Sequence, residues 1–596
     1  MAVWSIVTIG LYVMSVVFAP VHRTLAGRFV FVSVILALTA SMSYSVTYSG
    51  PVPRLFLITA CVACVCVIAS TRGKAEARLP KLGWGEAAAG VFTVVTAWWF
   101  LPLVRLGTAE EVVARLGRRP DQAAHFSLIE FIRTNNAIPA VLPDSVAMTS
   151  RLSHYPAGYH SIVASVMELS QGRVTSIEID PVQYAHSYSL VVGLTIVVLM
   201  AAIASHEPIR KSRVLTFSAL AMMGAFWFGS RMGAGLSAHG WGNFIIASCA
   251  ATIAMMTLTR MAVAFSRRDA VILAACLTLT VDTWPVLAVA PWVGALVLLT
   301  KLSFSRERRD GRLSALATAC LGAVVLSART VLRMSHAPRD FEVPFYLVGG
   351  AITHDPPWVS IALVCLALGI TFASSPTGAT SPVLKILDPV VSQIIVMAIV
   401  LAFVGWQQLQ ILGSLQYYWF KPATFAALLS LVGVLLATSR PGVGLLLKLV
   451  ALGAALTILA SGVVAQGPGL YARGAWSEFP SEAQRLAAAR ALVGAQQLSQ
   501  QQGRIAYLDN AVLTEQGLSD DELDQRIAYA RWALALAGKD ARGDHDVPSD
   551  AYYSSGSIEE RARLVAQRHP SVTVLIKPGP WADALEAAGV RVTRLA

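Results

Sequence analysis

RRPDQAAHFSLIEFIRTNNAIP (residues 118–139), followed by SHYPAGYH (153–160), separates two groups of long apolar segments. The stretch is rich in charged and aromatic residues, whereas the whole chain is 55% hydrophobic and 14% charged, with a mean hydropathy of +0.59. Soluble domains usually carry about 25% charged residues. Apolar runs long enough to cross a bilayer recur on both sides of the stretch. The sequence therefore predicts a polytopic α-helical membrane protein.

About fourteen transmembrane helices are expected from the apolar runs. They are expected near 3–19, 29–47, 54–71, 85–104, 182–204, 214–229, 241–259, 269–283, 286–300, 314–330, 358–374, 388–406, 422–438 and 442–464.

Basic loops set the expected orientation of these helices. Lys and Arg gather in the connections at 71–81, 207–213, 266–269 and 301–312, which the positive-inside rule assigns to the cytoplasm. The N-terminus and the alternate connections then face outward, and these connections are 105–181, 230–240, 331–357 and 407–421. We expect a multi-pass protein of a bacterial plasma membrane, with the opening stretch on the external face.

The net charge of +12 does not indicate nucleic-acid binding. Residues 467–596 carry 14 basic and 16 acidic side chains, while the remaining chain carries 33 and 19. The excess positive charge thus lies in the membrane part, where it is a topology signal. No nucleic-acid partner is expected.

Three parts are expected along the chain. Residues 1–84 would supply three N-terminal transmembrane helices, 85–466 a membrane core with the large external loop 105–181, and 467–596 an extracytoplasmic α/β domain. The last part alternates helical segments with short strand-like segments, GRIAYLDN, VTVLIKP and VRVTRLA. It lacks a nucleotide-binding glycine motif, so binding or scaffolding is favoured over catalysis for this part.

Asp121 and His125 are the first candidates for chemistry. They lie four residues apart in DQAAHFSLIEFIRTNN, so a helix would place both on one face, and Phe126, Ile129 and Ile132 lie close to an apolar stripe. We expect an amphipathic helix on the outer membrane surface. The pair would suit proton transfer or part of a divalent-metal site for Mg²⁺ or Mn²⁺. The alternative is that Asp121 only caps the helix.

HYPAGYH adds His154, Tyr155 and His160 around a Pro-Gly turn. The histidines supply ligands or donors on the same side as Asp121. The alternative for the tyrosines is an aromatic belt at the membrane interface.

Cations at the expected external ends of spans form a third group of candidates: Arg231, His239, Arg329, Arg333 and Lys421. Arginine binds phosphate through a planar fork and lysine acts as a point charge, so the group suggests an anionic ligand such as a lipid phosphate. Each residue alone is also explained as snorkelling from a helix end. Asp282 lies at a turn between two spans, where capping of the hairpin is favoured.

A long first external loop that carries an Asp, with two short helices and many following spans, resembles the C-type glycosyltransferases (GT-C). The pattern DQAAHF, IP, HYPAGYH and a later YYWFK is similar to actinobacterial members that build cell-envelope glycans. The resemblance covers roughly 85–466 by topology. It implies a polyprenyl-phosphate-linked sugar as donor, and an envelope glycan or lipid as acceptor. It also implies Asp121 as the base, with Lys421 and Arg231 or Arg329 near the donor phosphate.

Two features depart from that family. Four spans precede the loop where the family usually has one, although the sidedness of the loop is preserved. The paired acidic motif of many members is also not evident, which leaves a metal requirement open.

Two other functions remain as alternatives. A transporter or flippase of a lipid-linked precursor would carry ionisable residues deep within its spans and often repeated halves. Here charge within spans is scarce, with Lys448 the main exception. A non-catalytic envelope assembly subunit would use its C-terminal part to recruit partners.

Overall fold

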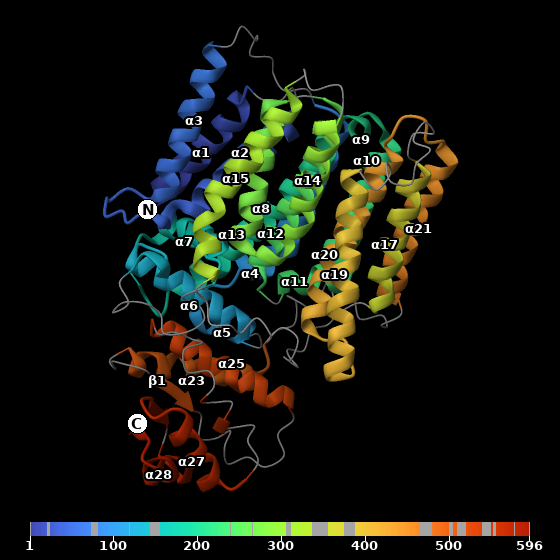
Figure 1. Ribbon diagram of the computed structural model, residues 1–596. Coiled ribbons are helices and arrows are strands. Elements are labelled where there is room, and N and C mark those ends of the chain that lie inside the picture. The colour runs from blue at the N-terminus through green and yellow to red at the C-terminus, as the bar shows by residue number, and fades with distance from the viewer. Residues whose placement is uncertain are drawn as a thin grey trace.

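The structure is a computed structural model, and it is predominantly a bundle of long helices (Figure 1). It describes residues 2–20, 24–72, 82–117, 120–142, 155–173, 175–238, 240–264, 266–304, 311–335, 356–374, 388–464, 480–499, 505–508, 520–538, 547, 550–551, 556–576 and 578–594.

Each of the fourteen expected spans coincides with a helix. The helices are α1 (Ala2–Phe18), α2 (Leu25–Met42), α3 (Arg54–Arg72), α4 (Trp84–Val104), α8 (Asp180–Ser205), α10 (Arg213–Gly224), α12 (Gly242–Val263), α13 (Arg267–Thr283), α14 (Val289–Phe304), α15 (Arg312–Ser335), α17 (Pro357–Ala373), α19 (Pro389–Leu412), α20 (Tyr417–Thr438) and α21 (Leu445–Val464). Among the described residues, ten helices are long and apolar enough to cross a membrane. Helices α1, α10 and α17 form shorter apolar segments, and α13 has 17 residues that include Asp269 and Asp282.

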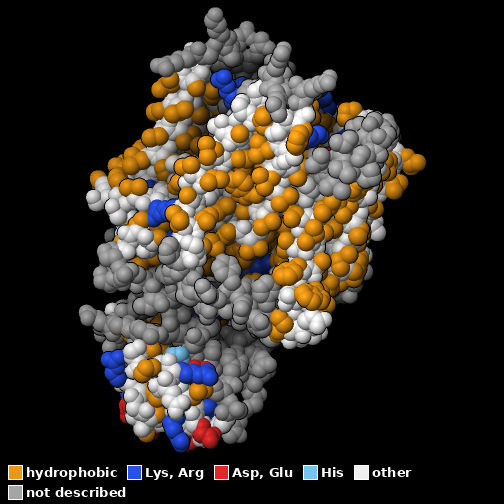
Figure 2. All heavy atoms as spheres, in the orientation of Figure 1, with side chains coloured by type: hydrophobic (Ala, Val, Ile, Leu, Met, Phe, Trp, Pro, Cys, Tyr) orange, Lys and Arg blue, Asp and Glu red, His pale blue; other side chains and the backbone are white. Residues whose placement is uncertain are grey.

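The centre of the bundle is formed by α8, α12 and α20. Of their most apolar segments, 83%, 89% and 100% is buried inside the protein, against 22% for α3 and 28% for α15. The outer helices instead expose large apolar side chains, as Val65 on α3 and Leu321 on α15 do. Figure 2 shows hydrophobic side chains covering the bundle, while charged side chains of both signs gather on the C-terminal part. An apolar outer surface of this kind is what a lipid bilayer requires of a helical protein.

Short helices cover one end of the bundle. They are α5 (Ala109–Leu116), α6 (Pro120–Asn135), α7 (Gly158–Gln171) and α11 (Arg231–Ala238). Helix α5 begins at a capping box, in which the Thr108 hydroxyl and the Glu111 carboxylate each accept a backbone N–H of the other residue. At the opposite end the short helix α9 (Glu207–Lys211) carries the basic connection after α8.

The C-terminal part contains a small parallel sheet. Strands β1 (Ile505–Leu508), β2 (Thr573–Ile576) and β3 (Arg591–Arg594) pair in the order β1-β2-β3. The helices around them are α23 (Glu482–Leu498), α25 (Asp520–Leu536), α27 (Ile558–Arg568) and α28 (Pro580–Ala587). The three segments predicted as strands thus form the strands, and helices connect them as parallel pairing requires.

Helices α23 and α25 pack against α5 and α6, so the C-terminal part lies at the same end of the bundle as the 105–181 loop (Figure 1). The Tyr529 hydroxyl donates to the Ala114 carbonyl at 3.4 Å, and the rings of Trp532 and Phe126 lie 5.3 Å apart. The sequence predicted that these two parts would lie on the same side of the bundle.

Helix α6 does not lie open on a membrane surface, and that expectation is wrong. Nearly every residue from Gln122 to Glu130 is buried, because α7 covers one side of α6 and α25 covers another. Phe126 of the apolar stripe contacts the C-terminal part, where its ring packs against that of Trp532. The sequence pattern identified the apolar face correctly but not its partner.

Candidate functional site

Several candidate residues meet where the starts of α7, α12 and α20 approach Trp284, directly before the short 3₁₀ helix η5 (Pro285–Ala288). Two glycines permit this approach. A Cβ at Gly158 would lie 2.8 Å from the Asp282 carbonyl oxygen, and one at Gly242 would lie 2.4 Å from the Tyr159 ring. Only residues without a side chain fit at these two positions. The starts of α7 and α12 are therefore drawn tightly into the site.

Asp121 and Lys421 lie against the same tryptophan. The Trp241 indole N–H donates to Asp121 Oδ2 at 2.8 Å. The Lys421 ammonium lies 4.1 Å from the centre of the Trp241 ring and 4.7 Å from that of Trp284. Lys421 is only 4% exposed. A desolvated ammonium over an indole face gains about 2 kcal/mol from the ring quadrupole, which helps to keep this buried charge in place.

His125 and His160 form a hydrogen-bonded pair beside this group. His125 Nδ1 and His160 Nε2 lie 2.9 Å apart, and both side chains are buried. One ring must donate and the other accept, so the pair shares one proton along the bond. Histidine is the side chain suited to carrying a proton near neutral pH. The structure thus brings together two candidate histidines, one from α6 and one from α7.

Tyrosines surround the histidine pair. Tyr155 lies 6.1 Å from His125 and 5.6 Å from His160 by ring centres, and its hydroxyl accepts a hydrogen bond from Asn243 Nδ2 at 2.7 Å. Tyr159 is fully buried, and burial raises its pKa well above the usual value. Tyr159 therefore stays neutral, and Tyr155 is a site residue as well as an aromatic near a helix end.

A second charged group lies on α13 and α15, next to the start of α7. The Thr330 hydroxyl donates to Asp282 Oδ1 at 2.6 Å, which shows that this carboxylate joins two helices and does more than cap a hairpin. Arg329 donates to the Ser45 carbonyl through Nη1 at 3.1 Å. Its Nη2, and both Nε and Nη2 of Arg333, are buried without a hydrogen-bond partner in the described part of the chain. Buried guanidinium donors of this kind are suited to an oxyanion.

The remaining predicted site residues are Arg231, His154 and His239. Arg231 is half-buried at the start of α11. His154 and His239 lie outside the described residues. In the part of the chain that the structure describes, no group of three or more His, Cys, Asp or Glu side chains is arranged to hold a metal ion. Asp121 and His125 therefore gain no third protein ligand there.

Sequence reasoning missed Trp241, Trp284 and Asn243. Tryptophans near the ends of spans are common at membrane interfaces, so their positions alone do not indicate a site. The signal that points to Trp241 is its place in SAHGWGN, the short connection that also carries the candidate His239.

Two arginine-centred clusters border the site and fix its helices. In the first, Arg133 bonds Glu130 at 2.7 Å and Asp180 at 2.6 Å, which joins α6 to the start of α8. Burial raises the pKa of Glu130 to about 8, and the neighbouring Arg133 opposes that rise. Asp180 adds to the rise because one guanidinium cannot neutralise two buried carboxylates. The cluster therefore holds a proton near neutral pH.

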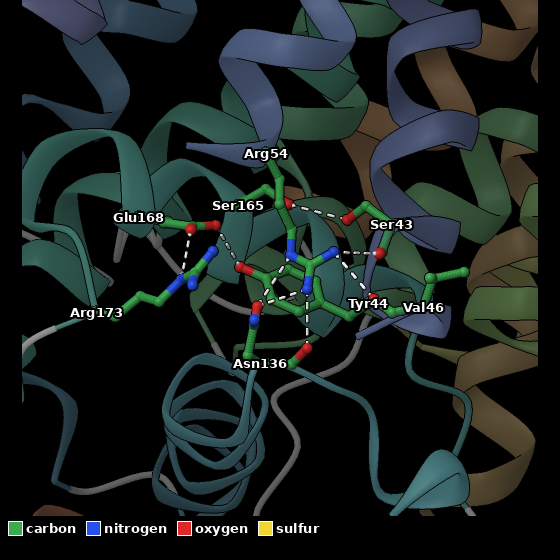
Figure 3. Close-up of polar contacts among 8 residues, drawn as sticks. All are labelled: Ser43, Tyr44, Val46, Arg54, Asn136, Ser165, Glu168 and Arg173. Carbon is green, nitrogen blue, oxygen red and sulfur yellow. Dashed lines mark hydrogen bonds and ion pairs between the residues drawn. The ribbon is translucent and has the colours of Figure 1, made fainter. Parts of the chain in front are cut away.

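The second cluster is centred on Arg54 and is drawn in Figure 3. The Arg54 guanidinium donates to the carbonyls of Ser43 (2.7 Å) and Val46 (3.1 Å), and to both the carbonyl and the side-chain oxygen of Asn136. Asn136 has φ 56°, a left-handed conformation that asparagine tolerates, and this turn directs both of its oxygens at Arg54. The cluster ties α3 to the turn after α6.

The same cluster reaches α7 through Tyr44. Its hydroxyl donates to Glu168 Oε2 at 3.0 Å, and Glu168 also pairs with Arg173 at 2.8 Å. The N-terminal helices are thus joined to the two short helices that carry Asp121 and the histidine pair.

The arrangement can accept a proton and attract an anion in one place. Asp121 and the histidine pair supply groups for proton transfer, and Lys421 with Arg329 and Arg333 supplies positive charge. The surrounding tryptophans and tyrosines provide faces on which an apolar or ring-shaped ligand can pack. No protein-family model matches the chain, and no curated protein matches it either.

Proposed function

We propose that the chain is an integral membrane glycosyltransferase that transfers a sugar from a polyprenyl-phosphate donor to an envelope glycan or lipid acceptor. The observation that carries the proposal is that Asp121 and Lys421, from helices 300 residues apart, contact the same Trp241 ring. A base and a buried cation on one aromatic platform suit a reaction in which a hydroxyl attacks while a phosphate leaves.

Asp121 acts as the base in this scheme. An acceptor hydroxyl attacks the anomeric carbon of the donor sugar, and its proton passes to the Asp121 carboxylate. The bond between that carbon and the phosphate oxygen breaks, a new glycosidic bond forms, and polyprenyl phosphate leaves with the bonding electron pair. His125 and His160 lie one turn further along α6 and on α7, where they can carry the proton onward.

Lys421 holds the departing phosphate. A single ammonium between two indole rings stabilises the charge that develops on the leaving oxygen. Arg329 and Arg333 extend the positive region beyond Asp282. The GT-C resemblance stated above predicts the same division between a loop carboxylate and basic residues at span ends. The basic loops favour a location of the site and residues 467–596 on the external face of a bacterial plasma membrane.

The orientation is tested by cysteine labelling. Glu110→Cys on α5 and Glu559→Cys on α27 should react in intact cells with a reagent that does not cross membranes, whereas Lys211→Cys on α9 should react only after the cells are opened. The unsubstituted chain, which has seven cysteines, gives the background. Protection of Glu110→Cys in intact cells would contradict an external site.

The activity is tested with purified protein in liposomes and a panel of polyprenyl-phosphate-linked pentoses and hexoses. We expect transfer from one donor class by the wild-type chain, and its loss in a variant that combines Asp121→Asn with Lys421→Met. Movement of the lipid between leaflets without any sugar transfer would instead support a flippase. Full support of envelope assembly in cells by the double variant would support a non-catalytic subunit.

A further inference from the structure

A cavity of about 460 Å³ lies between the three N-terminal helices and the central helices α8 and α12. On α8 its lining runs from Gln183 to Val198, which corresponds to about 22 Å at the helical rise of 1.5 Å per residue. The hydrocarbon core of a bilayer is about 30 Å thick. The cavity is therefore a long slot that extends from one end of α8 past the middle of the bundle.

The wall of the slot is apolar because its polar side chains bond to the protein. The hydroxyls of Tyr12 and Ser33 lie 2.6 Å apart, and Ser170 donates to Gln183 at 2.7 Å. The Thr59 hydroxyl donates to the backbone of its own helix. The remaining lining consists largely of Leu, Ile, Val and Ala. Such a wall accepts hydrocarbon and offers little to a polar ligand.

The slot opens sideways between α1 and α8. Three residues line the slot and are also exposed on the outer surface: Ile9 on α1, and Leu190 and Leu194 on α8. These residues lie within apolar helices of the bundle, where a membrane protein is surrounded by lipid chains. A chain can therefore enter from the bilayer without passing through water.

The slot also adjoins the candidate site through shared helices. On α7, Ile162 lines the slot two residues after His160, and on α12, Ile246 lines it three residues after Asn243. On α13, Leu279 lines the slot three residues before Asp282. A molecule that filled the slot would thus have one end within about one helical turn of the charged and aromatic residues.

We propose that the slot binds the single isoprenoid chain of the donor lipid, with α1–α3 as its outer wall. The volume is the space open to the centre of a water-sized sphere, and spread over the length it corresponds to a path about 5 Å wide for atom centres, which admits one hydrocarbon chain. A phospholipid brings two chains and fits the slot poorly. The identity of the chain as polyprenyl rests on the proposed function, whereas the binding of one hydrocarbon chain rests on the slot alone.

The assignment gives the N-terminal helices a role in selecting the donor. Each buried methylene contributes about 0.8 kcal/mol, so a longer chain binds more tightly until the slot is full. The Arg54 cluster holds these helices against α6 and α7, which keeps the slot aligned with the site.

Photocrosslinking tests the proposal without any need for sugar transfer. The purified protein in liposomes is labelled with a polyprenyl monophosphate that carries a diazirine near the far end of its chain. We expect labelled peptides from α1, α8 and α12, including those with Ile9, Leu190 or Ile253. Unlabelled polyprenyl monophosphate should remove the labelling, and phosphatidylglycerol at the same concentration should not. Absence of label from these helices, or equal competition by both lipids, would overturn the proposal.

Two variants fill the slot from different helices, and a third is their control. Ala37→Trp on α2 and Thr195→Trp on α8 place an indole in the slot, while Val94→Trp on α4 places one on an exposed apolar surface. We expect the first two to lower the labelling at least tenfold and the control to leave it unchanged, with size-exclusion profiles confirming that all three fold. Unchanged labelling in either slot variant that folds would contradict the assignment.

The same assay separates this proposal from the proposed function. Asp121→Asn should label as strongly as the wild-type chain, because the carboxylate does not contact the slot. Strong, polyprenyl-specific labelling of a wild-type protein that transfers no sugar would refute the glycosyltransferase and leave the lipid slot in place.

Discussion

Arg54 and Lys421 are both buried cations at the same end of the bundle, and each lies over two aromatic rings, yet Arg54 is also held by backbone carbonyls. Arg54 donates to three backbone carbonyls and one side-chain oxygen, all in fixed positions. Lys421 lies over two indole faces, with Asp121 bonded to the edge of one of them. The first cation holds backbone segments together, and the second lies among groups that can rearrange around a ligand.

The chemistry of the two side chains explains the difference. A guanidinium is a rigid fork whose hydrogen bonds fix the groups around it, whereas an ammonium is a compact point charge that adapts to its surroundings. We therefore interpret the Arg54 cluster as a structural clamp, and the Lys421 group as a binding site for an anion.

Arg54→Ala should have the largest effect on folding. It leaves several buried carbonyl oxygens without donors, each of which costs about 1–3 kcal/mol, so we expect a loss of at least about 3 kcal/mol in the free energy of unfolding. Thermal unfolding in detergent measures the change, and Arg54→Lys should recover only part of it because the fork is lost. Arg105→Ala, at an exposed position near the same end, is the control. Equal stability of Arg54→Ala and Arg105→Ala would show that the clamp does not exist.

Lys421→Met should show the opposite pattern, with a large effect on binding and a small one on folding. Methionine fills the space between the indoles and leaves no cavity, so the expected cost to stability is limited to about the 2 kcal/mol of the lost cation–π attraction. A hydrogen bond to a charged group contributes about 1.5–3 kcal/mol, so we expect polyprenyl monophosphate to bind about 10–100-fold more weakly. Lys301→Met, at the exposed far end of α14, should bind normally. Normal binding by Lys421→Met would remove the lysine from the phosphate site.

The Glu130 cluster should make the stability of the fold depend on pH, with a smaller effect than the two substitutions above. Because the folded protein raises the pKa of Glu130 to about 8, the folded state holds a proton that the unfolded chain releases above its ordinary pKa. The contribution is fully present below that ordinary value and is lost as the pH rises through about 8, so the free energy of unfolding should fall as the pH rises from 5 to 8. Glu130→Gln should flatten this dependence. Thermal unfolding at a series of pH values measures it, and an unchanged slope in the variant would assign the proton elsewhere.

The sequence predicted the helices far better than their partners. Apolar runs of membrane length identify spans because a lipid-embedded backbone must satisfy its own hydrogen bonds, and each expected span coincides with a helix. Helix α6 shows the limit of such patterns. Its apolar face was evident, but its partner Trp532 lies some 400 residues away, and periodicity carries no information about such contacts.

The site was predictable in its residue types and only partly in its geometry. Asp121, His125, Tyr155, His160 and Lys421 do gather, because the loop that carries the first four and the span end that carries Lys421 lie at the same end of the bundle. The two tryptophans that join them could not be distinguished from interfacial aromatics in a single sequence.

Sugar transfer and lipid binding measured together on Asp121→Asn test the central claim most directly. Asparagine keeps the size of the side chain and can still accept the Trp241 hydrogen bond, but it cannot take a proton from the acceptor. We predict transfer at least about a hundredfold below that of the wild-type chain, as expected for loss of a general base, with unchanged binding of polyprenyl monophosphate. Transfer at the wild-type rate would contradict the account, because the proton would then leave the acceptor without Asp121.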